Sequence, residues 1–145
     1  MSTSITFTLD GQEITVPEGT TILEAAHEYG IQIPAICYHE ATTPGGLCRL
    51  CVVDVNEQRV LKPACIEPCK ADSIVKNKTE RVARSRRTIL EMLNASTDLS
   101  ESPEIQQYMD DYEVDRERFP AAIAPEHDVI DDNPFYIRDY SQCVL

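Results

Sequence analysis

The sequence contains no long apolar run and no recognisable targeting segment. No window approaches the roughly 18 consecutive apolar residues of a membrane span, so none is expected. The first six residues include neither basic side chains nor an apolar stretch, so we expect no secretory signal. Internal repeats and low-complexity segments are also absent. Together these absences favour a cytoplasmic globular protein.

Basic residues are scarce in the last third of the chain. Residues 1–93 carry 12 acidic and 10 basic side chains, whereas residues 94–145 carry 13 acidic and 3 basic ones. Because an acidic surface repels phosphate groups, we expect no nucleic-acid partner. We interpret the acidic third as a solvated face rather than a docking patch for a basic protein.

Six cysteines are present, and their setting argues against disulfide bonds. Without an export signal, thiols that bind metal or take part in catalysis are favoured over a disulfide framework. Four of the thiols cluster in one stretch and are the candidate metal ligands: Cys37, Cys48, Cys51 and Cys65. Cys69 follows closely, and Cys143 stands alone.

The first thirty residues predict two strands and a helix. Residues 5–9 and 13–16 alternate apolar and polar side chains around Asp10-Gly11, which is a strong signal for a tight hairpin turn. Either Thr20 or Thr21 is suited to cap a helix, and Glu24 completes a capping box with Thr21. The helix is predicted to end at a glycine and to bury one stripe of residues: Ile22, Leu23, Ala25, Ala26 and Tyr29.

A second hairpin is predicted between the later cysteines. Residues 52–55 form the first arm, 56–58 the turn and 59–61 the returning arm. The cysteines lie at the outer ends of these arms, so pairing the arms brings Cys48 and Cys51 near Cys65. Residues 73–75 predict one more short strand, and the sheet with a helix across it is an α+β arrangement.

Helical periodicity returns at residues 79–93, where Val82, Ile89, Leu90 and Leu93 share a face. The arginines on the other faces are interpreted as a solvated or partner-facing surface rather than a nucleic-acid site: Arg81, Arg84, Arg86 and Arg87.

Three regions follow from these patterns. We expect a compact domain over residues 1–78, a connecting helix over 79–93 and an acidic, mostly irregular extension over 94–145. Within the extension, a short helix is predicted to start at Pro103 and run through Tyr112. The rest is predicted to be an extended connector that docks through four apolar side chains: Phe119, Phe135, Tyr136 and Ile137.

The cysteine spacing favours an iron-sulfur cluster. A [2Fe-2S] cluster needs four ligands, usually thiolates, and backbone amides close to its sulfurs. The two-residue gap between Cys48 and Cys51 suggests that these two thiolates share one iron. Gly45 and Gly46 permit the backbone angles that aim N–H groups inward, and together with Arg49 they are the candidate cofactor-binding residues. Such a site transfers single electrons and forms no bonds of its own.

Other functions of these thiols stay open. A structural zinc site with four cysteine ligands usually contains two CxxC pairs, and this sequence has one. The alternative function is therefore an assembly module whose thiols hold zinc or no metal. Cys37 and His39 are close in sequence, but a nucleophilic pair needs a geometry that nearness alone does not give. We interpret His39 as a loop residue and Cys69 as a buried thiol rather than an alternative ligand.

Three segments of the sequence resemble a known family. They are Ile-Pro-Ala-Ile-Cys-Tyr-His at 33–39, Pro-Gly-Gly-Leu-Cys-Arg-Leu-Cys at 44–51 and Pro-Ala-Cys at 63–65. About residues 4–93 resemble the N-terminal [2Fe-2S] ferredoxin domain of the NADH dehydrogenase large iron-sulfur subunit, the [FeFe] hydrogenases and the NAD-dependent formate dehydrogenase alpha subunits. The plant-type spacing, C-x4-C-x2-C, does not fit. The resemblance implies a β-grasp fold and four ligands: Cys37, Cys48, Cys51 and Cys65.

The sequence also differs from this family in one segment. In such families a segment after the long helix supplies one His and three Cys to a [4Fe-4S] cluster, but residues 93–104 contain neither residue type, so we expect that cluster to be absent. Residues 131–145 resemble the lead-in to a domain with two [4Fe-4S] clusters, in which Cys143 is the first ligand. We therefore expect a longer polypeptide and do not count Cys143 as a ligand here.

The resemblance implies a role as well. The chain is expected to be a relay module of a larger soluble oxidoreductase, without catalytic turnover of its own. Its partner is expected to be a redox protein, or a catalytic subunit or domain that carries further iron-sulfur clusters.

Overall fold

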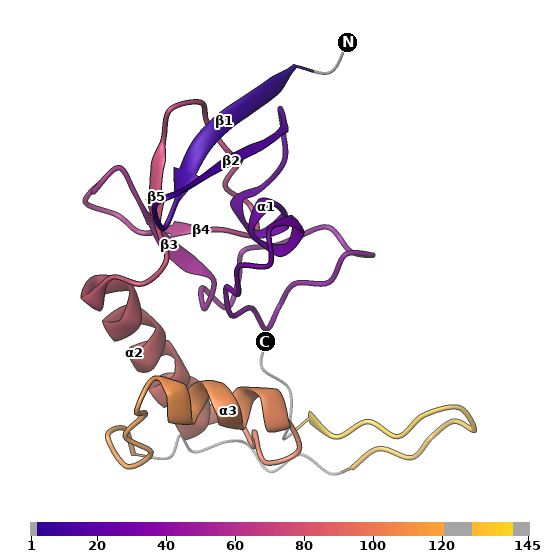
Figure 1. Cartoon of the computed structure of the whole chain (residues 1–145). Coiled ribbons are helices and arrows are strands. Elements are labelled where there is room, and N and C mark those ends of the chain that lie inside the picture. Colours follow the sequence, from indigo (N-terminus) through magenta and orange to yellow (C-terminus); the bar gives the residue numbers. More distant parts are fainter. Residues whose placement is uncertain (1–2, 121–128, 141–145) are drawn as a thin grey trace. The chain divides into compact units, whose positions relative to one another are not determined.

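The computed structural model describes residues 3–120 and 129–140 (Figure 1). The chain divides into two compact units, Met1–Arg86 and Arg87–Leu145. Cys143 lies outside the described residues. None of the helices in the described part of the chain is long and apolar enough to cross a membrane.

The first unit is built on a mixed sheet of five strands in the order β2-β1-β5-β3-β4. β1 and β5 run parallel, and the other neighbouring strands run antiparallel. The strands are β1 (Ser4–Leu9), β2 (Gln12–Pro17), β3 (Val52–Val55), β4 (Lys62–Pro63) and β5 (Ile74–Lys76). With helix α1 (Ile22–Glu28) beside the sheet, this confirms the predicted α+β, β-grasp fold (Figure 1).

The N-terminal hairpin forms where its turn residues predict it. Asp10 (φ 50°) and Gly11 (φ 85°) both adopt the left-handed conformation that a two-residue turn of type I′ requires. The register pairs Leu9 with Gln12, so the apolar residues of both strands point to one face. Their side chains are buried and form much of the core: Phe7, Leu9, Ile14 and Val16.

Helix α1 is capped by Thr21 rather than Thr20. The Thr21 hydroxyl accepts from the Glu24 amide at 3.3 Å, and the Glu24 carboxylate accepts from the Thr21 amide at 2.8 Å, which completes the predicted capping box. Four residues of the predicted stripe are buried, but Tyr29 is 39% exposed and the prediction was wrong there. Tyr29 is the C-cap, past the last helical turn, and its hydroxyl donates to the Thr15 carbonyl at 3.0 Å.

Removing this cap gives a first testable prediction. Thr21→Ala is expected to lower the free energy of unfolding by about 1 kcal/mol, because the Glu24 amide loses its acceptor. Urea denaturation of the chain measures the change. Thr20→Ala is the matched control, since the Thr20 carbonyl that accepts from Cys69 belongs to the backbone. An equal loss of unfolding free energy in both variants would show that Thr21 is not the specific cap of the helix.

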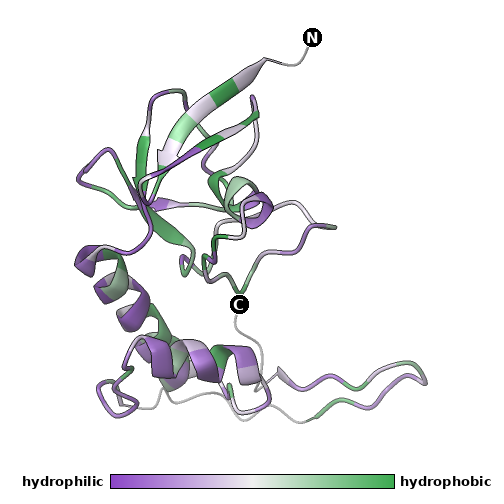
Figure 2. Ribbon diagram, viewed as in Figure 1, coloured by the Kyte–Doolittle hydropathy of each residue, from purple (hydrophilic) through white to green (hydrophobic). Residues whose placement is uncertain are grey.

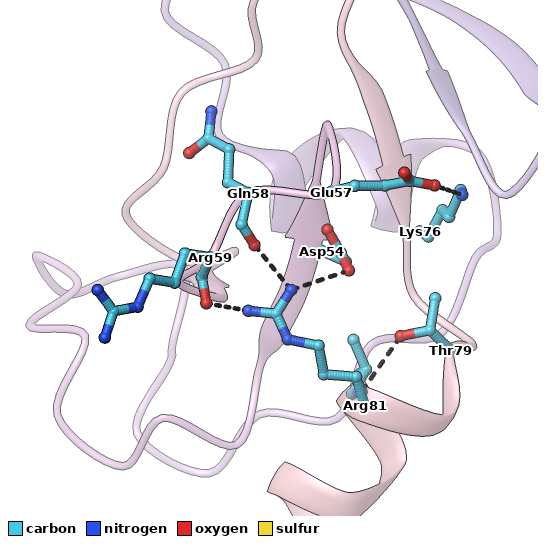
Figure 3. A network of polar contacts seen from close by, with 8 residues as sticks. Asp54, Glu57, Gln58, Arg59, Lys76, Thr79 and Arg81 are labelled. Carbon is cyan, nitrogen blue, oxygen red and sulfur yellow. Dashed lines mark hydrogen bonds and ion pairs between the residues drawn. The ribbon is translucent and has the colours of Figure 1, made fainter.

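The second hairpin differs from its prediction. The returning arm is β4, whose Pro63 pairs with Val52, whereas residues 59–61 form a loop. Arg81 explains the shift, because its guanidinium donates to the Gln58 carbonyl at 2.7 Å and also to the Arg59 carbonyl (Figure 3). Those carbonyls are therefore engaged by a side chain instead of a strand ladder.

Arg81 belongs to the long helix α2 (Glu80–Ser96), which extends three residues beyond the predicted end at 93. Hydrophilic and hydrophobic residues alternate along this helix (Figure 2). The predicted solvated arginine face is wrong for Arg86, which is only 2% exposed. Helical spacing contained the signal, because Arg86 lies midway between Val82 and Leu90, and both of these are fully buried.

The second unit contains the short helix predicted at Pro103. Helix α3 (Pro103–Asp111) carries the proline in its first turn and ends with Tyr112 as its C-cap. The same unit contains a half-buried ion pair, in which the Glu91 carboxylate is 2% exposed and accepts from the half-exposed Arg118 at 2.7 Å.

Three of the four side chains predicted to dock the connector are exposed: Phe135 at 89%, Tyr136 at 58% and Ile137 at 64%. Phe119 is partly buried, with Arg118 Cζ 5.3 Å from the centre of its ring, and docking of the connector stays a prediction. The segment is held by two backbone hydrogen bonds between Ile130 and Arg138, both of 2.9 Å. The domain limits at 78 and 93 stay a prediction.

Candidate iron-sulfur site

The cysteine loop joins α1 to β3 and is anchored at both ends by buried residues. Ile33 is 4% exposed at its start, and Leu50 is fully buried at its end. Cys51 directly precedes β3, and Cys65 follows β4 by two residues. The Ala64 amide donates to the Cys51 carbonyl at 3.1 Å, so strand pairing brings Cys51 and Cys65 together as predicted.

The four predicted thiols meet as two pairs. The Cys48 amide donates to Cys37 Sγ at 3.4 Å. Burial raises the pKa of Cys65, and so do the charges of the other three thiols, which are close enough to act on it, with that of Cys51 first. The structure thus pairs Cys48 with Cys37, and which of the thiolates share an iron stays a prediction.

Backbone conformation explains this pairing. Arg49, between Cys48 and Cys51, adopts the left-handed region at φ 62°, which bends the chain between these two cysteines. Each thiol therefore meets a partner from a more distant part of the sequence. A left-handed arginine is uncommon, and no local sequence signal predicts one at this position.

Burial and hydrogen bonding act on these thiols in opposite directions. Burial favours the neutral form of Cys37, but hydrogen bonds from the Cys48 and Leu47 amides outweigh it and lower the pKa of this thiol. Burial raises the pKa of Cys48. Burial and the charge of Cys51 raise the pKa of Cys65 to about 12. Because the pKa values of Cys48 and Cys65 are raised, a positively charged metal centre is needed to keep all four cysteines as thiolates.

The three candidate cofactor-binding residues differ in backbone conformation. Gly46 is left-handed at φ 62°, and a Cβ there would lie 2.7 Å from Ile66 Cδ1. Gly45 has no left-handed φ, so the unusual angle predicted for it was wrong. Arg49 contributes the bend described above, with its side chain exposed. Direct contact of these three residues with a cofactor stays a prediction.

Cys69 and His39 stand apart from the four thiols. Cys69 is buried, and burial raises its pKa to about 11, with further effects from Glu24 and Glu28 rather than from other cysteines. Its amide donates to the Thr20 carbonyl at 2.8 Å. His39 is exposed, and its Nδ1 accepts from the Ala41 amide at 3.1 Å instead of engaging Cys37. These contacts agree with a buried thiol and a loop residue.

The arrangement of the thiols in two pairs bears on the kind of metal centre that they fit. A zinc site needs four ligands around one ion. A [2Fe-2S] cluster takes four ligands over two irons, so two pairs of thiols fit it.

Comparison with known proteins supports the same cofactor. The family model for a 2Fe-2S iron-sulfur cluster binding domain matches residues 2–80, more than half of the chain. The chain belongs to this family. This 2Fe-2S domain therefore has a [2Fe-2S] cluster as its cofactor and is an electron-transfer module.

Named relatives of the 2Fe-2S domain are subunits of larger oxidoreductases. It is 42% identical over 94 residues to the NADP-reducing hydrogenase subunit HndD of Solidesulfovibrio fructosivorans, covering 61% of this chain and 16% of that protein. It is 40% identical over 91 residues to an NADH-quinone oxidoreductase subunit of Streptomyces coelicolor, covering 61% of this chain and 11% of that protein. The chain thus spans a small part of these relatives.

A solved structure extends the similarity beyond the 2Fe-2S domain. The crystal structure of an NAD+-reducing [NiFe]-hydrogenase in the H2-reduced state matches with a TM-score of 0.85 and 31% identity. The match covers 99% of this chain and 63% of that one. These similarities confirm the resemblance to hydrogenase and NADH dehydrogenase subunits inferred from the cysteine motifs.

Proposed function

We propose that four cysteines hold the [2Fe-2S] cluster, with Cys37 and Cys48 on one iron and Cys51 and Cys65 on the other. Two hydrogen bonds carry this proposal, since the Cys48 amide donates to Cys37 Sγ at 3.4 Å and the Ala64 amide donates to the Cys51 carbonyl at 3.1 Å, which brings the two cysteines of each pair together. When bound, the cluster accepts and gives up one electron at a time.

The protein's own part is to stabilise negative charge on the sulfurs. The Cys48 amide donates to Cys37 Sγ at 3.4 Å, and backbone amides lower the pKa of Cys37 against the effect of burial. Such N–H donors favour the more negative, reduced state. Cys51 and Cys65 are each 1% exposed, whereas Cys37 and Cys48 are partly exposed. Electrons therefore enter or leave on the side of Cys37 and Cys48.

The wider role is relay within a larger enzyme. In this proposal the chain passes electrons to or from partner subunits with further iron-sulfur clusters, in a cytoplasmic oxidoreductase of the hydrogenase or NADH dehydrogenase type. The relatives are named as subunits of larger enzymes, which supports a role as one part of an assembly. A formate dehydrogenase as the parent enzyme stays a prediction.

Counting electrons tests the relay directly. Anaerobic titration of the purified chain with dithionite is expected to consume one electron per chain and to produce one unpaired spin per chain by electron paramagnetic resonance. A thiol-only or zinc-bound assembly module takes up no electron under these conditions. Uptake of no electron, or of two, would contradict the proposal.

A further inference from the structure

Arg86 is a buried cation that contacts the backbone at the end of the cysteine loop. Its side chain is 2% exposed. By residue volume it is the largest of the almost completely buried side chains in the described part of the chain. Nε donates to the Leu50 carbonyl at 3.1 Å, and Nη2 donates to the Val52 carbonyl at 2.8 Å. These two carbonyls belong to the residues on either side of Cys51. The guanidinium therefore holds the backbone that presents one of the proposed ligands.

Asn77 connects this cation to the other end of the loop. Arg86 Nη2 donates to Asn77 Oδ1 at 2.6 Å, and Asn77 Nδ2 donates to the Gln32 carbonyl at 3.0 Å. Asn77 is itself 2% exposed. Gln32 begins the segment that leads to Cys37. One buried pair of side chains thus connects both stretches that carry proposed ligands.

The buried charge of Arg86 affects the oxidised and reduced states of the cluster to different degrees. A buried charge is screened much less than an exposed one, so its field reaches neighbouring groups. A [2Fe-2S] cluster with four thiolate ligands becomes more negative on reduction. A fixed cation behind the loop therefore stabilises the reduced state more than the oxidised state.

The same contacts fix a peptide plane. The carbonyl of Leu50 and the amide of Cys51 belong to one planar trans peptide, so they point in opposite directions. Because Arg86 holds this carbonyl, it also directs the Cys51 amide away from itself. An amide held in this orientation would not have to reorient when the cluster is reduced.

We propose that Arg86, held by Asn77, is a positioning residue that raises the reduction potential of the cluster. The inference rests on the proposed function, since it takes Cys51 as a ligand. It concerns residues outside the cysteine motifs, and the family match ends at residue 80, before Arg86.

Redox titration of the full chain, followed by visible absorption, tests this role. Arg86→Met removes the charge and is expected to lower the equilibrium constant for one-electron reduction at least tenfold, which is about 59 mV for one electron. Asn77→Asp places a carboxylate at the atom that Arg86 already contacts and is expected to lower the constant at least threefold. Arg86→Lys keeps the charge and is expected to stay within threefold of the wild-type constant.

Two arginines on the same helix provide matched controls. Arg81 also donates to two backbone carbonyls, but these belong to Gln58 and Arg59 in the loop after β3, and neither residue adjoins a cysteine in the sequence (Figure 3). Arg84 is exposed and pairs with Glu80 at 2.9 Å. Arg81→Met and Arg84→Met are each expected to change the constant less than threefold.

The outcomes separate this inference from the proposed function. A wild-type chain without a [2Fe-2S] spectrum would refute the proposed function. A normal spectrum with a wild-type potential in Arg86→Met or Asn77→Asp would refute the role of Arg86 alone. Loss of the cluster from both variants would also overturn it, because the pair would then serve assembly rather than potential.

Discussion

Cys48→Ala is expected to abolish the visible absorption of the [2Fe-2S] cluster, whereas Cys69→Ala leaves it largely intact. Cys48 shares a hydrogen bond with Cys37 and is one of the two partly exposed members of the four-thiol group. Removing it leaves one iron a ligand short, and a cluster held by three thiolates is readily lost. Absorption spectra of the purified variants, with iron analysis, measure the effect.

The comparison with Cys69 makes this prediction specific. Both variants remove one thiol, but the charges that act on Cys69 come from Glu24 and Glu28 rather than from the other cysteines. Cys69→Ala is therefore a control for the general loss of a cysteine. If both variants lost the cluster, the fourth ligand would be wrongly assigned. If Cys48→Ala kept the wild-type spectrum, the proposed ligand set would be refuted.

Gly46→Val is expected to lower the free energy of unfolding by roughly 2 kcal/mol. The φ of 62° at Gly46 is strained for any residue with a Cβ, and most of all for a β-branched one. The added Cβ would also lie 2.7 Å from Ile66 Cδ1. That atom is the end of a side chain that is 44% exposed and can move aside, so backbone strain is the larger contribution. Urea denaturation measures the change.

The neighbouring glycine is the control for this prediction. Gly45 has no left-handed φ, and a Cβ there meets only the exposed side chain of Leu47, at 3.1 Å. Gly45→Ala is expected to change the free energy of unfolding by less than about 0.5 kcal/mol. Adding Ile66→Ala to Gly46→Val is expected to recover only a minor part of the loss. Full recovery would mean that the steric contact, not the backbone, requires glycine at 46.

Local sequence signals predicted much of the fold. The Asp10-Gly11 turn and the capping box of Thr21 and Glu24 form because each depends on residues within a few positions of one another. The approach of Cys51 to Cys65 followed from strand pairing, which the predicted hairpin after Cys51 indicated.

Features that depend on distant contacts were missed. The returning arm moved to Lys62–Pro63 because Arg81, far along the chain, binds the carbonyls of the loop. The pairing of the thiols depends on the left-handed backbone at Arg49, which residue type does not indicate. The charge of Arg86 favours a solvated face, whereas its helical spacing from the buried Val82 and Leu90 indicates burial. In each case a tertiary contact outweighed a local preference.

Metal and sulfide analysis of the purified chain tests the central claim most directly. The account predicts iron and acid-labile sulfide in a two-to-two ratio per chain, with the visible absorption of a [2Fe-2S] cluster and no zinc. A colourless protein with one equivalent of zinc, or with no metal when isolated and handled without oxygen, would contradict it.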